Sequence, residues 1–218
     1  CGVCGAFPFI AGMSTTMANM GIIYTSSPVF IVILSVFLFS EKISLNRIVG
    51  LIICLIGVIT IITKGNFNYL INFSFTTGDF WMLGAAIGWA LYSIYLLNWK
   101  SKFSLMGRFT LIAFFGFISL FPFYILEESL FFDTKFNSTF LAWVLFAAIS
   151  PGIIAFSLYT KVQRYLGASL TGFTLYLFAV YGAIFGIILF EEMLLPFHYY
   201  GGALVFAGVY IARKIKTI

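Results

Sequence analysis

The chain has 218 residues, of which 62% are hydrophobic, 20% aromatic and 9% charged, and its net charge is +5 at pH 7. An average soluble domain is roughly 25% charged, so a mean hydropathy of +1.08 excludes a water-soluble enzyme, a disordered segment and a nucleic-acid-binding domain. Long uncharged runs separate the charged residues, and the first of them covers residues 1–40. Because a membrane-spanning helix needs roughly 20 apolar residues, the composition predicts a polytopic membrane protein.

The uncharged runs predict an all-α fold with seven complete spans. In chain order we place these spans at residues 15–40, 47–63, 79–99, 108–126, 139–161, 168–190 and 197–213. The runs are continuous rather than alternating, which favours helices over β-barrel strands. Residues 12–16 form the one plausible turn before the second run, so residues 1–11 make about half a span. We therefore expect the chain to begin inside a truncated helix.

The positions of the basic residues predict the orientation. With the C-terminus inside, ten of the twelve Lys and Arg residues face the cytoplasm, and six of the seven acidic residues face outward. Cytoplasmic loops of membrane proteins carry such an excess of Lys and Arg. The basic net charge therefore reflects topology, and we expect a lipid bilayer rather than a nucleic acid as the macromolecular environment.

The chain contains an internal repeat. A shift of 151 residues aligns residues 28–61 with residues 179–212 without a gap, and eight of the 34 positions are identical. The identical pairs include Glu41 with Glu192, Gly50 with Gly201, and Gly57 with Gly208. The copies begin five spans apart, so they cross the membrane in opposite directions. This predicts an inverted-topology repeat, an arrangement common in secondary transporters; the alternative is convergence of two hydrophobic hairpins.

The repeated segment resembles a known family. The run from Pro28 through Glu41 and Lys42, followed by Gly50 and by Gly57-Val58, resembles the EamA-domain signature of the drug/metabolite transporter superfamily. The second copy keeps Leu189-Phe-Glu-Glu192, Gly201 and Gly208-Val209, but has Ala179 where the first copy has Pro28. Residues 78–93 are similar to the helix that opens the second half of such proteins.

The resemblance implies ten helices in two five-helix halves. On that pattern, residues 1–65 are the C-terminal part of the first half, residues 66–78 are an external linker, and residues 79–218 are the second half. We expect no cofactor.

The residues for catalysis or metal binding are missing from the sequence. His198 is the single histidine, and no Ser/His/Asp group, metal-ligand cluster or phosphate-binding glycine loop accompanies it. Cys1 and Cys4 form a CxxC motif without a second pair, which we interpret as coincidence. We therefore expect neither an enzyme nor a metal site.

Neutral side chains must then build a substrate site, because no ionisable residue lies in the middle of a predicted span. This absence favours a facilitator or exchanger over a proton-coupled pump. We predict substrate contacts from Asn19, Thr16, Ser27, Pro28, Trp89, Tyr92, Ser157, Thr174 and Tyr176. Helix packing and interface anchoring are the structural alternatives for these residues.

Six further residues are predicted to act in structure or gating, namely Glu41, Glu192, Gly50, Gly57, Gly201 and Gly208. The two glutamates end equivalent helices, where each is expected to accept hydrogen bonds at the start of the next helix or to latch one gate.

The resemblance implies a transporter in a cell (inner) membrane that moves a small-molecule substrate by alternating access. Its cargo is expected to be a polar or zwitterionic metabolite such as an amino acid, and its direction export. The alternative is a non-transporting membrane scaffold or a degenerate fragment. Monomer and homodimer both stay open.

Overall fold

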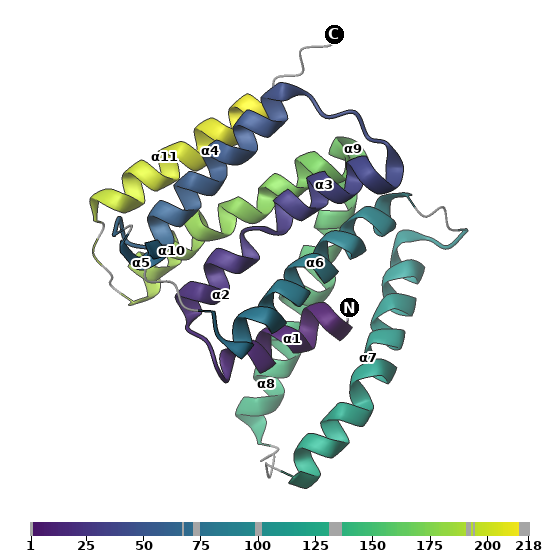
Figure 1. The fold of residues 1–218 in the computed structure, drawn as a ribbon. Coiled ribbons are helices and arrows are strands. Elements are labelled where there is room, and N and C mark those ends of the chain that lie inside the picture. Colours follow the sequence, from purple (N-terminus) through teal and green to yellow (C-terminus); the bar gives the residue numbers. More distant parts are fainter. Residues whose placement is uncertain are drawn as a thin grey trace.

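The computed structural model describes residues 2–66, 68–71, 75–98, 102–130, 137–190, 193 and 195–213. Within these residues the chain consists of helices and connecting turns, without strands (Figure 1), which confirms the all-α prediction. In chain order the helices are α1 (Gly2–Gly12), α2 (Met17–Tyr24), α3 (Ser27–Phe39), α4 (Leu45–Ile62), α5 (Asn68–Ile71), α6 (Thr77–Asn98), α7 (Leu105–Leu130), α8 (Ser138–Ala147), the π-helix η1 (Ala148–Ala155), α9 (Phe156–Gly172), the 3-10 helix η2 (Phe173–Tyr176), α10 (Leu177–Phe190) and α11 (Pro196–Arg213).

The described helices include four segments that are long and apolar enough to cross a membrane. They are Asn19–Phe39, Leu45–Ile62, Thr77–Asn98 and Ser138–Tyr181, and Gly107–Pro122 is a shorter apolar helix. The fourth segment has 44 residues, and the helix changes direction within it at Gly167, whose φ is 80° (Figure 1). Glycine adopts this left-handed backbone without steric cost. Residues on the two sides of Gly167 therefore form separate helices. The apolar segments make the chain a multi-pass membrane protein.

The first complete span is interrupted between α2 and α3. The hydroxyls of Thr25, Ser26 and Ser27 each donate a hydrogen bond to the backbone carbonyl three residues earlier. Pro28 follows, and it has no N–H to continue the helical ladder. The missing N–H leaves the carbonyl of Tyr24 without its helical donor, and no water replaces it inside a bilayer. The Ser27 hydroxyl supplies this hydrogen bond instead, at 2.7 Å.

The segment just before the second copy is also irregular, although Ala179 replaces the proline of the first copy. A shift of 151 residues places η2 over residues 22–25, where α2 ends. The Thr174 hydroxyl donates to the carbonyl of Thr171 at 2.7 Å, as the three hydroxyls do in the first copy. The helix is thus irregular just before each copy at matching positions, and before the second copy this happens without a proline.

Helices α4 and α11 lie side by side (Figure 1), in closest contact at four glycines. A Cβ added to Gly50 would lie 2.5 Å from the carbonyl oxygen of Gly208, and one added to Gly57 would lie 2.7 Å from that of Gly201. Any larger side chain would hold the two backbones apart. These four residues, predicted to be structural or gating glycines, therefore permit the close crossing of the two helices.

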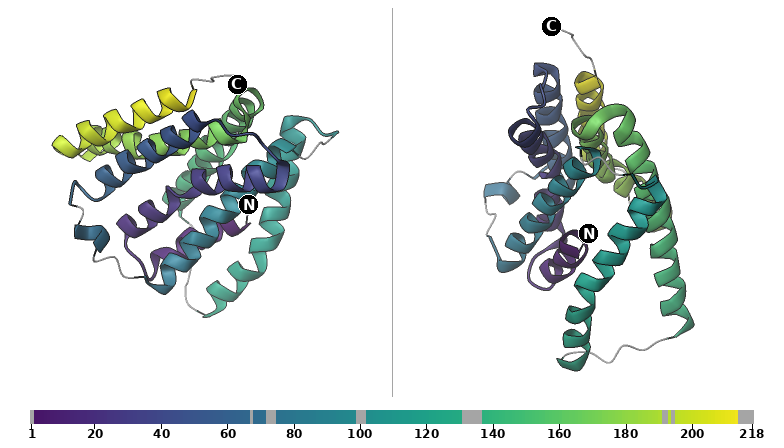
Figure 2. Two further views of the ribbon diagram at one scale, coloured as in Figure 1. Left: turned by 45° about the horizontal axis from the view of Figure 1, so that its top comes forward. Right: turned by 90° about the vertical axis from the view of Figure 1, so that its right-hand side faces the viewer.

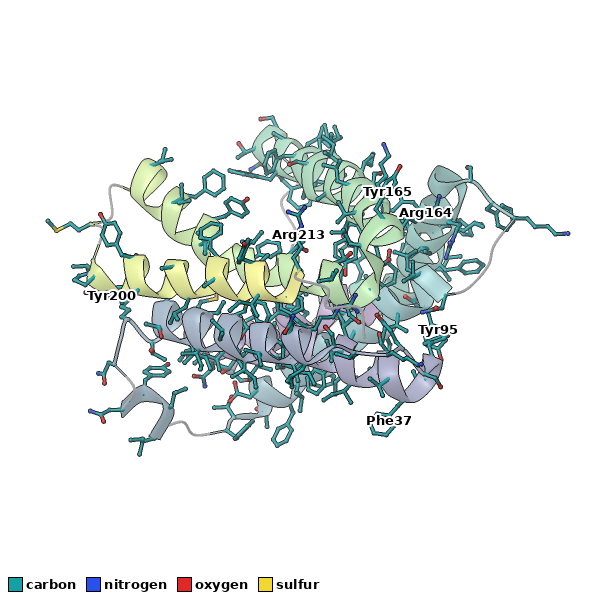
Figure 3. All side chains as sticks on the ribbon, turned by 90° about the horizontal axis from the view of Figure 1, so that it is seen from above. Phe37, Tyr95, Arg164, Tyr165, Tyr200 and Arg213 are labelled. Carbon is teal, nitrogen blue, oxygen red and sulfur yellow. The ribbon has the colours of Figure 1, made fainter. Side chains whose placement is uncertain are left out.

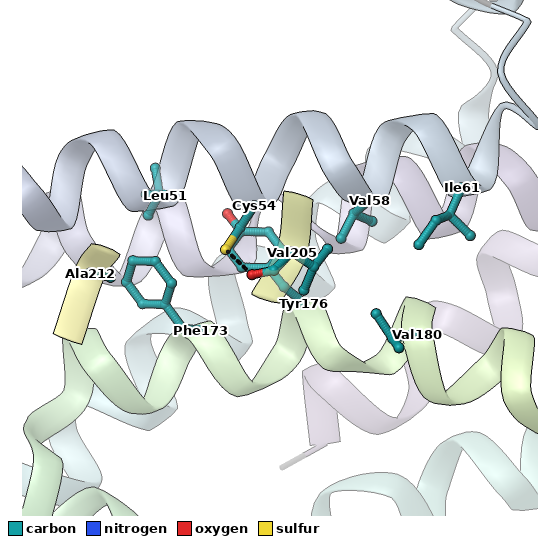
Figure 4. Close-up of a cluster of buried hydrophobic side chains, with 9 residues drawn as sticks. All are labelled: Leu51, Cys54, Val58, Ile61, Phe173, Tyr176, Val180, Val205 and Ala212. Atoms are coloured by element: carbon teal, nitrogen blue, oxygen red, sulfur yellow. Dashed lines mark hydrogen bonds between the residues drawn. The ribbon is translucent and has the colours of Figure 1, made fainter. Parts of the chain in front are cut away.

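Nine buried side chains pack around this crossing (Figure 4). They are Leu51, Cys54, Val58, Ile61, Phe173, Tyr176, Val180, Val205 and Ala212, contributed by α4, η2, α10 and α11. At the centre the Cys54 thiol donates a hydrogen bond to the Val205 carbonyl oxygen at 3.4 Å. The second copy of the repeat thus packs directly on the first.

Helix α6 lies in the other part of the bundle, packed against α1, α2, α3 and α9. A second buried cluster holds α3, α6 and the α9–η2 segment together through Ile31, Ala90, Ile94, Ala168 and Leu175. Helix α7 lies at the edge of the bundle farthest from α4 and α11 (Figures 1 and 2).

Candidate functional site

A cavity of about 420 Å³ lies between α1, α2, α6 and the segment from η1 to α10. Its wall is formed by Cys4, Gly5, Tyr24, Trp89, Tyr92, Ala155, Phe156, Tyr159, Thr174, Leu175 and Phe178. None of these lining residues is Asp, Glu, Lys, Arg or His. The wall is therefore aromatic, and its hydroxyl groups come from three tyrosines and one threonine.

Trp89 of α6 is the centre of the aromatic wall. Its ring lies 5.6 Å from that of Tyr92, 5.6 Å from that of Phe156 and 5.4 Å from that of Tyr159, measured between centroids. The two tilted contacts and the edge-to-face contact with Phe156 are favourable geometries for aromatic pairs. These contacts join α6 to α9, so the cavity wall and the helix packing depend on the same side chains.

A buried polar chain leads away from the cavity. The hydroxyls of Tyr159 and Ser93 are hydrogen-bonded at 2.6 Å. The Gln163 side-chain N–H donates to the Ser93 carbonyl at 2.6 Å and to the Ser93 hydroxyl at 2.8 Å. Gln163 is only 1% exposed, and a buried amide needs such partners. The chain thus fixes the orientation of the Tyr159 hydroxyl at the cavity wall.

A second pocket of about 10 Å³, which has room for about one water molecule, borders the cavity, because Tyr92 and Phe156 line both. Its other lining residues are Leu96, Arg108, Phe109, Ile112, Ser157, Thr160 and Arg164. The Arg108 guanidinium donates to the Leu96 carbonyl at 2.8 Å, which positions its charge. Arg164 lies on the exposed side of α9 (Figure 3). Two cations therefore line the space next to the uncharged cavity.

The structure brings together some of the predicted substrate contacts. Trp89, Tyr92 and Thr174 line the cavity, and Ser157 lines the smaller pocket. The substrate-binding role of these four residues stays a prediction.

Three other predicted contacts lie in the core. The Ser27 hydroxyl is bonded to the Tyr24 carbonyl at 2.7 Å, and Pro28 packs against Gly172. Tyr176 is fully buried in the cluster around α4 and α11. Their positions in this structure are those of helix-break and packing residues, outside the cavity wall.

Asn19 and Thr16 lie in a polar cluster at the start of α6. The Asn19 side-chain N–H donates to Asp79 at 3.5 Å, and the Tyr69 hydroxyl donates to the Asn19 carbonyl oxygen at 3.3 Å. The Thr16 and Tyr69 hydroxyls are 3.2 Å apart. Neither predicted residue is part of the cavity lining.

Glu41 connects two elements. It accepts hydrogen bonds from Arg47 of α4 at 3.1 Å and from Ser169 of α9 at 3.0 Å. The first contact is an ion pair with the third residue of α4, and the second joins the segment after α3 to α9. The helix-start or gating role of Glu41 stays a prediction. Its counterpart Glu192 lies outside the described residues.

The cavity also includes residues that the sequence analysis left out of the site. Tyr24, Phe156, Tyr159 and Cys4 line it, and the position of Cys4 there gives that cysteine an environment that the CxxC pattern does not predict. The predicted contact on α9 is Ser157, which does not line the cavity. Phe156 and Tyr159 of α9 line it instead, together with Ala155 at the end of η1.

No described part of the chain offers a metal site, since no group of three His, Cys, Asp or Glu side chains lies close enough together. His198 has a structural role: its Nδ1 accepts a hydrogen bond from the backbone N–H of Leu195 at 3.1 Å and so caps α11.

Comparison with known proteins identifies relatives of the chain. The family model of the EamA-like transporter family matches residues 2–63 and 76–213. An uncharacterized transporter of Methanothermobacter thermautotrophicus is 27% identical over 93% of this chain and 59% of its own length. The uncharacterized transporter YetK of Bacillus subtilis is 26% identical over 90% of this chain and 60% of its own length. The chain thus spans about 60% of the length of these curated relatives.

A solved crystal structure has the same fold, with a TM-score of 0.75 over 97% of this chain and 72% of that one at 20% identity. A WAT1-related chloroplast protein of Arabidopsis thaliana, At3g02690, is 33% identical over 43% of this chain and 22% of its own length.

Proposed function

The chain belongs to the EamA-like transporter family, and on that premise we propose that the complete protein exports small zwitterionic metabolites, amino acids foremost, by alternating access. That the chain is part of a multi-pass membrane transporter follows from the family and from its apolar helices. The cargo, the direction and the mechanism are the proposal.

The observation that carries the proposal is the aromatic cavity with its adjoining cationic pocket. Small-molecule sites have volumes of about 300–1,000 Å³ and combine apolar walls with a few polar groups, and the cavity has about 420 Å³. Aromatic faces attract an ammonium group, and a guanidinium pairs with a carboxylate. Tyr92 lines both the cavity and the pocket of Arg108. At this boundary the aromatic rings are the partners of the ammonium group of a zwitterion, and the Arg108 guanidinium is the partner of its carboxylate.

The proposed direction follows from the charges. With a cytoplasmic C-terminus, Arg108 and Arg164 lie at the inner side of the membrane. Their positive potential draws carboxylates from the cytoplasm toward the cavity, which favours export from an inner membrane.

The contact pattern between α4 and α11 supports alternating access. Under the 151-residue shift, the contact of Gly50 with Gly208 becomes the contact of Gly201 with Gly57. Cys54 likewise bonds to Val205, its own counterpart in the repeat. Two copies related by a two-fold axis produce such reciprocal contacts. An inverted repeat of this kind lets two similar halves exchange conformations and open one site to either side.

The test is release of labelled amino acids and related metabolites from cells that express the full-length protein, its Trp89→Ala variant or an empty vector. We expect substrate-selective release from the first and a loss of it with Trp89→Ala at equal expression. No release above the empty vector for any solute in a broad panel would contradict the proposal and favour a non-transporting scaffold.

A further inference from the structure

Asp79, the third residue of α6, is fully buried. Its two carboxylate oxygens accept hydrogen bonds from the Thr15 hydroxyl, from the Asn19 side chain at 3.5 Å, and from the Thr76 backbone N–H at 2.7 Å and hydroxyl at 3.0 Å. None of the described residues forms an ion pair with it. A buried carboxylate is costly unless it is hydrogen-bonded, so these neutral donors hold it in place.

The four donors fall into two groups. Both Thr76 groups precede α6 and cap that helix locally, in the manner of a capping box. Thr15 lies in the turn after α1, and Asn19 lies in the first turn of α2. The Thr15 and Asn19 bonds therefore tie the α1–α2 turn to the start of α6, whereas the Thr76 bonds involve no second element.

The backbones at this junction are in close contact. A Cβ added to Gly78 would lie 2.6 Å from the carbonyl oxygen of Ala11 and 2.8 Å from the hydroxyl of Ser14. Next to this junction, the Tyr69 hydroxyl of α5 donates a hydrogen bond to the side-chain oxygen of Asn19 at 3.3 Å. The α1–α2 turn thus packs directly against the N-terminus of α6.

The elements that meet here also form one side of the cavity. Cys4 and Gly5 come from α1, Tyr24 from α2 and Trp89 from α6. Trp89 follows Asp79 by ten residues, which is about 15 Å along a helix. Separating the α1–α2 turn from α6 would therefore open the cavity wall from the end where α6 begins.

The opposite end of the bundle has a corresponding contact. Glu41, just after α3, accepts a hydrogen bond from Ser169 at 3.0 Å, and α3 ends near α9, away from the start of α6 (Figure 1). Among the described residues, Asp79 at one end of the bundle and Glu41 at the other each join two separate elements through a hydroxyl.

We propose that Asp79, Thr15 and Asn19 form a latch that closes the cavity at the end where α6 begins, which is the outer end in the predicted orientation. The proposal rests on the transport function above. Opening removes the Thr15 and Asn19 donors, and water replaces them, while Thr76 keeps its two hydrogen bonds to the carboxylate. Because the donors are uncharged, no cation is left unpaired when the latch opens.

The test uses Cys4, which lines the cavity, as the reporter in the full-length protein with every other cysteine, Cys1 and Cys54 among them, replaced by serine or alanine. A membrane-impermeant maleimide is added to intact cells, and separately to inside-out vesicles. We expect Thr15→Val to raise the labelling rate of Cys4 from the outer side at least threefold and to leave the rate from the inner side unchanged or lower. Thr15→Ser keeps the hydroxyl and should label at the parental rate.

Thr60→Val is the matched control, because the Thr60 hydroxyl bonds only within its own helix, to Ile56 at 2.8 Å. A parental outer rate for Thr15→Val would overturn the proposal, and so would an equal rise from both sides, which indicates general loosening. Labelling needs no substrate, so its result is independent of whether the release assay detects transport.

Discussion

Arg108 connects the cavity to the proposed choice of substrate. Its guanidinium lines the smaller pocket next to Tyr92 and is held by the Leu96 carbonyl. A hydrogen bond between charged partners contributes about 1.5–3 kcal/mol, which corresponds to roughly tenfold or more in rate or affinity. Arg108→Gln should therefore lower the release of an amino acid by that factor and leave the corresponding decarboxylated amine nearly unaffected.

Paired release assays with the two solutes check this prediction. Arg213→Gln, which removes a cation at the end of α11 outside both pockets, serves as the control. Equal losses for the amino acid and the amine would show that Arg108 acts on folding rather than on the carboxylate.

Gln163 joins α9 to α6 through hydrogen bonds, so its replacement should weaken this contact. Gln163→Leu removes the two hydrogen bonds that the Gln163 amide donates to the carbonyl and the hydroxyl of Ser93. We expect a loss of about 1–3 kcal/mol, seen as a lower melting temperature of the purified protein in detergent. Asn98→Leu is the comparison, because the Asn98 amide bonds only to Ile94 one turn earlier; equal shifts in the two variants would contradict the assignment.

Residue positions could be predicted from the sequence only in part. The sequence predicts Trp89 and Tyr92 as substrate contacts, and both line the cavity. Asp79 was placed at a helix end, but its burial depends on the α1–α2 turn that packs on it, and helical periodicity does not report such tertiary contacts. Tyr176 has the residue type of a cavity lining, yet α4 and α11 cover it.

The close packing of α4 against α11 can be tested by comparing two neighbouring glycines of α11, Gly201 and Gly202. A Cβ on Gly201 would lie 2.5 Å from Ile61 Cγ1 and 2.7 Å from the Gly57 carbonyl oxygen, whereas one on Gly202 meets nothing within 4 Å. Gly201→Ala should cost about 1–3 kcal/mol through overpacking. Gly202→Ala should be neutral or stabilising, since alanine is favoured over glycine in a helix by about 0.8–1.0 kcal/mol.

Melting temperatures of the two alanine variants decide this prediction. If both variants melt at the parental temperature, the two helices do not cross as closely as described.

The elements themselves were largely predictable. Long uncharged runs locate the helices, and the turn at residues 12–16 separates α1 from α2 as expected. Pro28 indicates the break after α2. The matching 3-10 helix η2 lacks a proline signal, because its shape depends on the Thr174 hydroxyl and on packing against the cluster around Cys54. The small helix α5 in the linker has no periodicity to reveal it.

For the whole molecule, the repeat predicts which helices correspond but not where a cavity forms. The two buried clusters fill the space around α4 and α11 and between α3 and α6. The cavity arises where α1, α2, α6 and α9 meet without filling the space between them. Its position depends on how large aromatic side chains such as Trp89 and Phe156 orient, which one sequence does not specify.

The central claim is that this cavity binds the transported solute. The most direct measurement is counterflow of a labelled amino acid in proteoliposomes of the purified full-length protein, compared with Trp89→Ala and with Trp143→Ala, whose side chain is 67% exposed outside the cavity. We predict saturable exchange that Trp89→Ala abolishes and Trp143→Ala retains. Exchange unaffected by Trp89→Ala, or none above protein-free liposomes with a folded protein, would contradict the account.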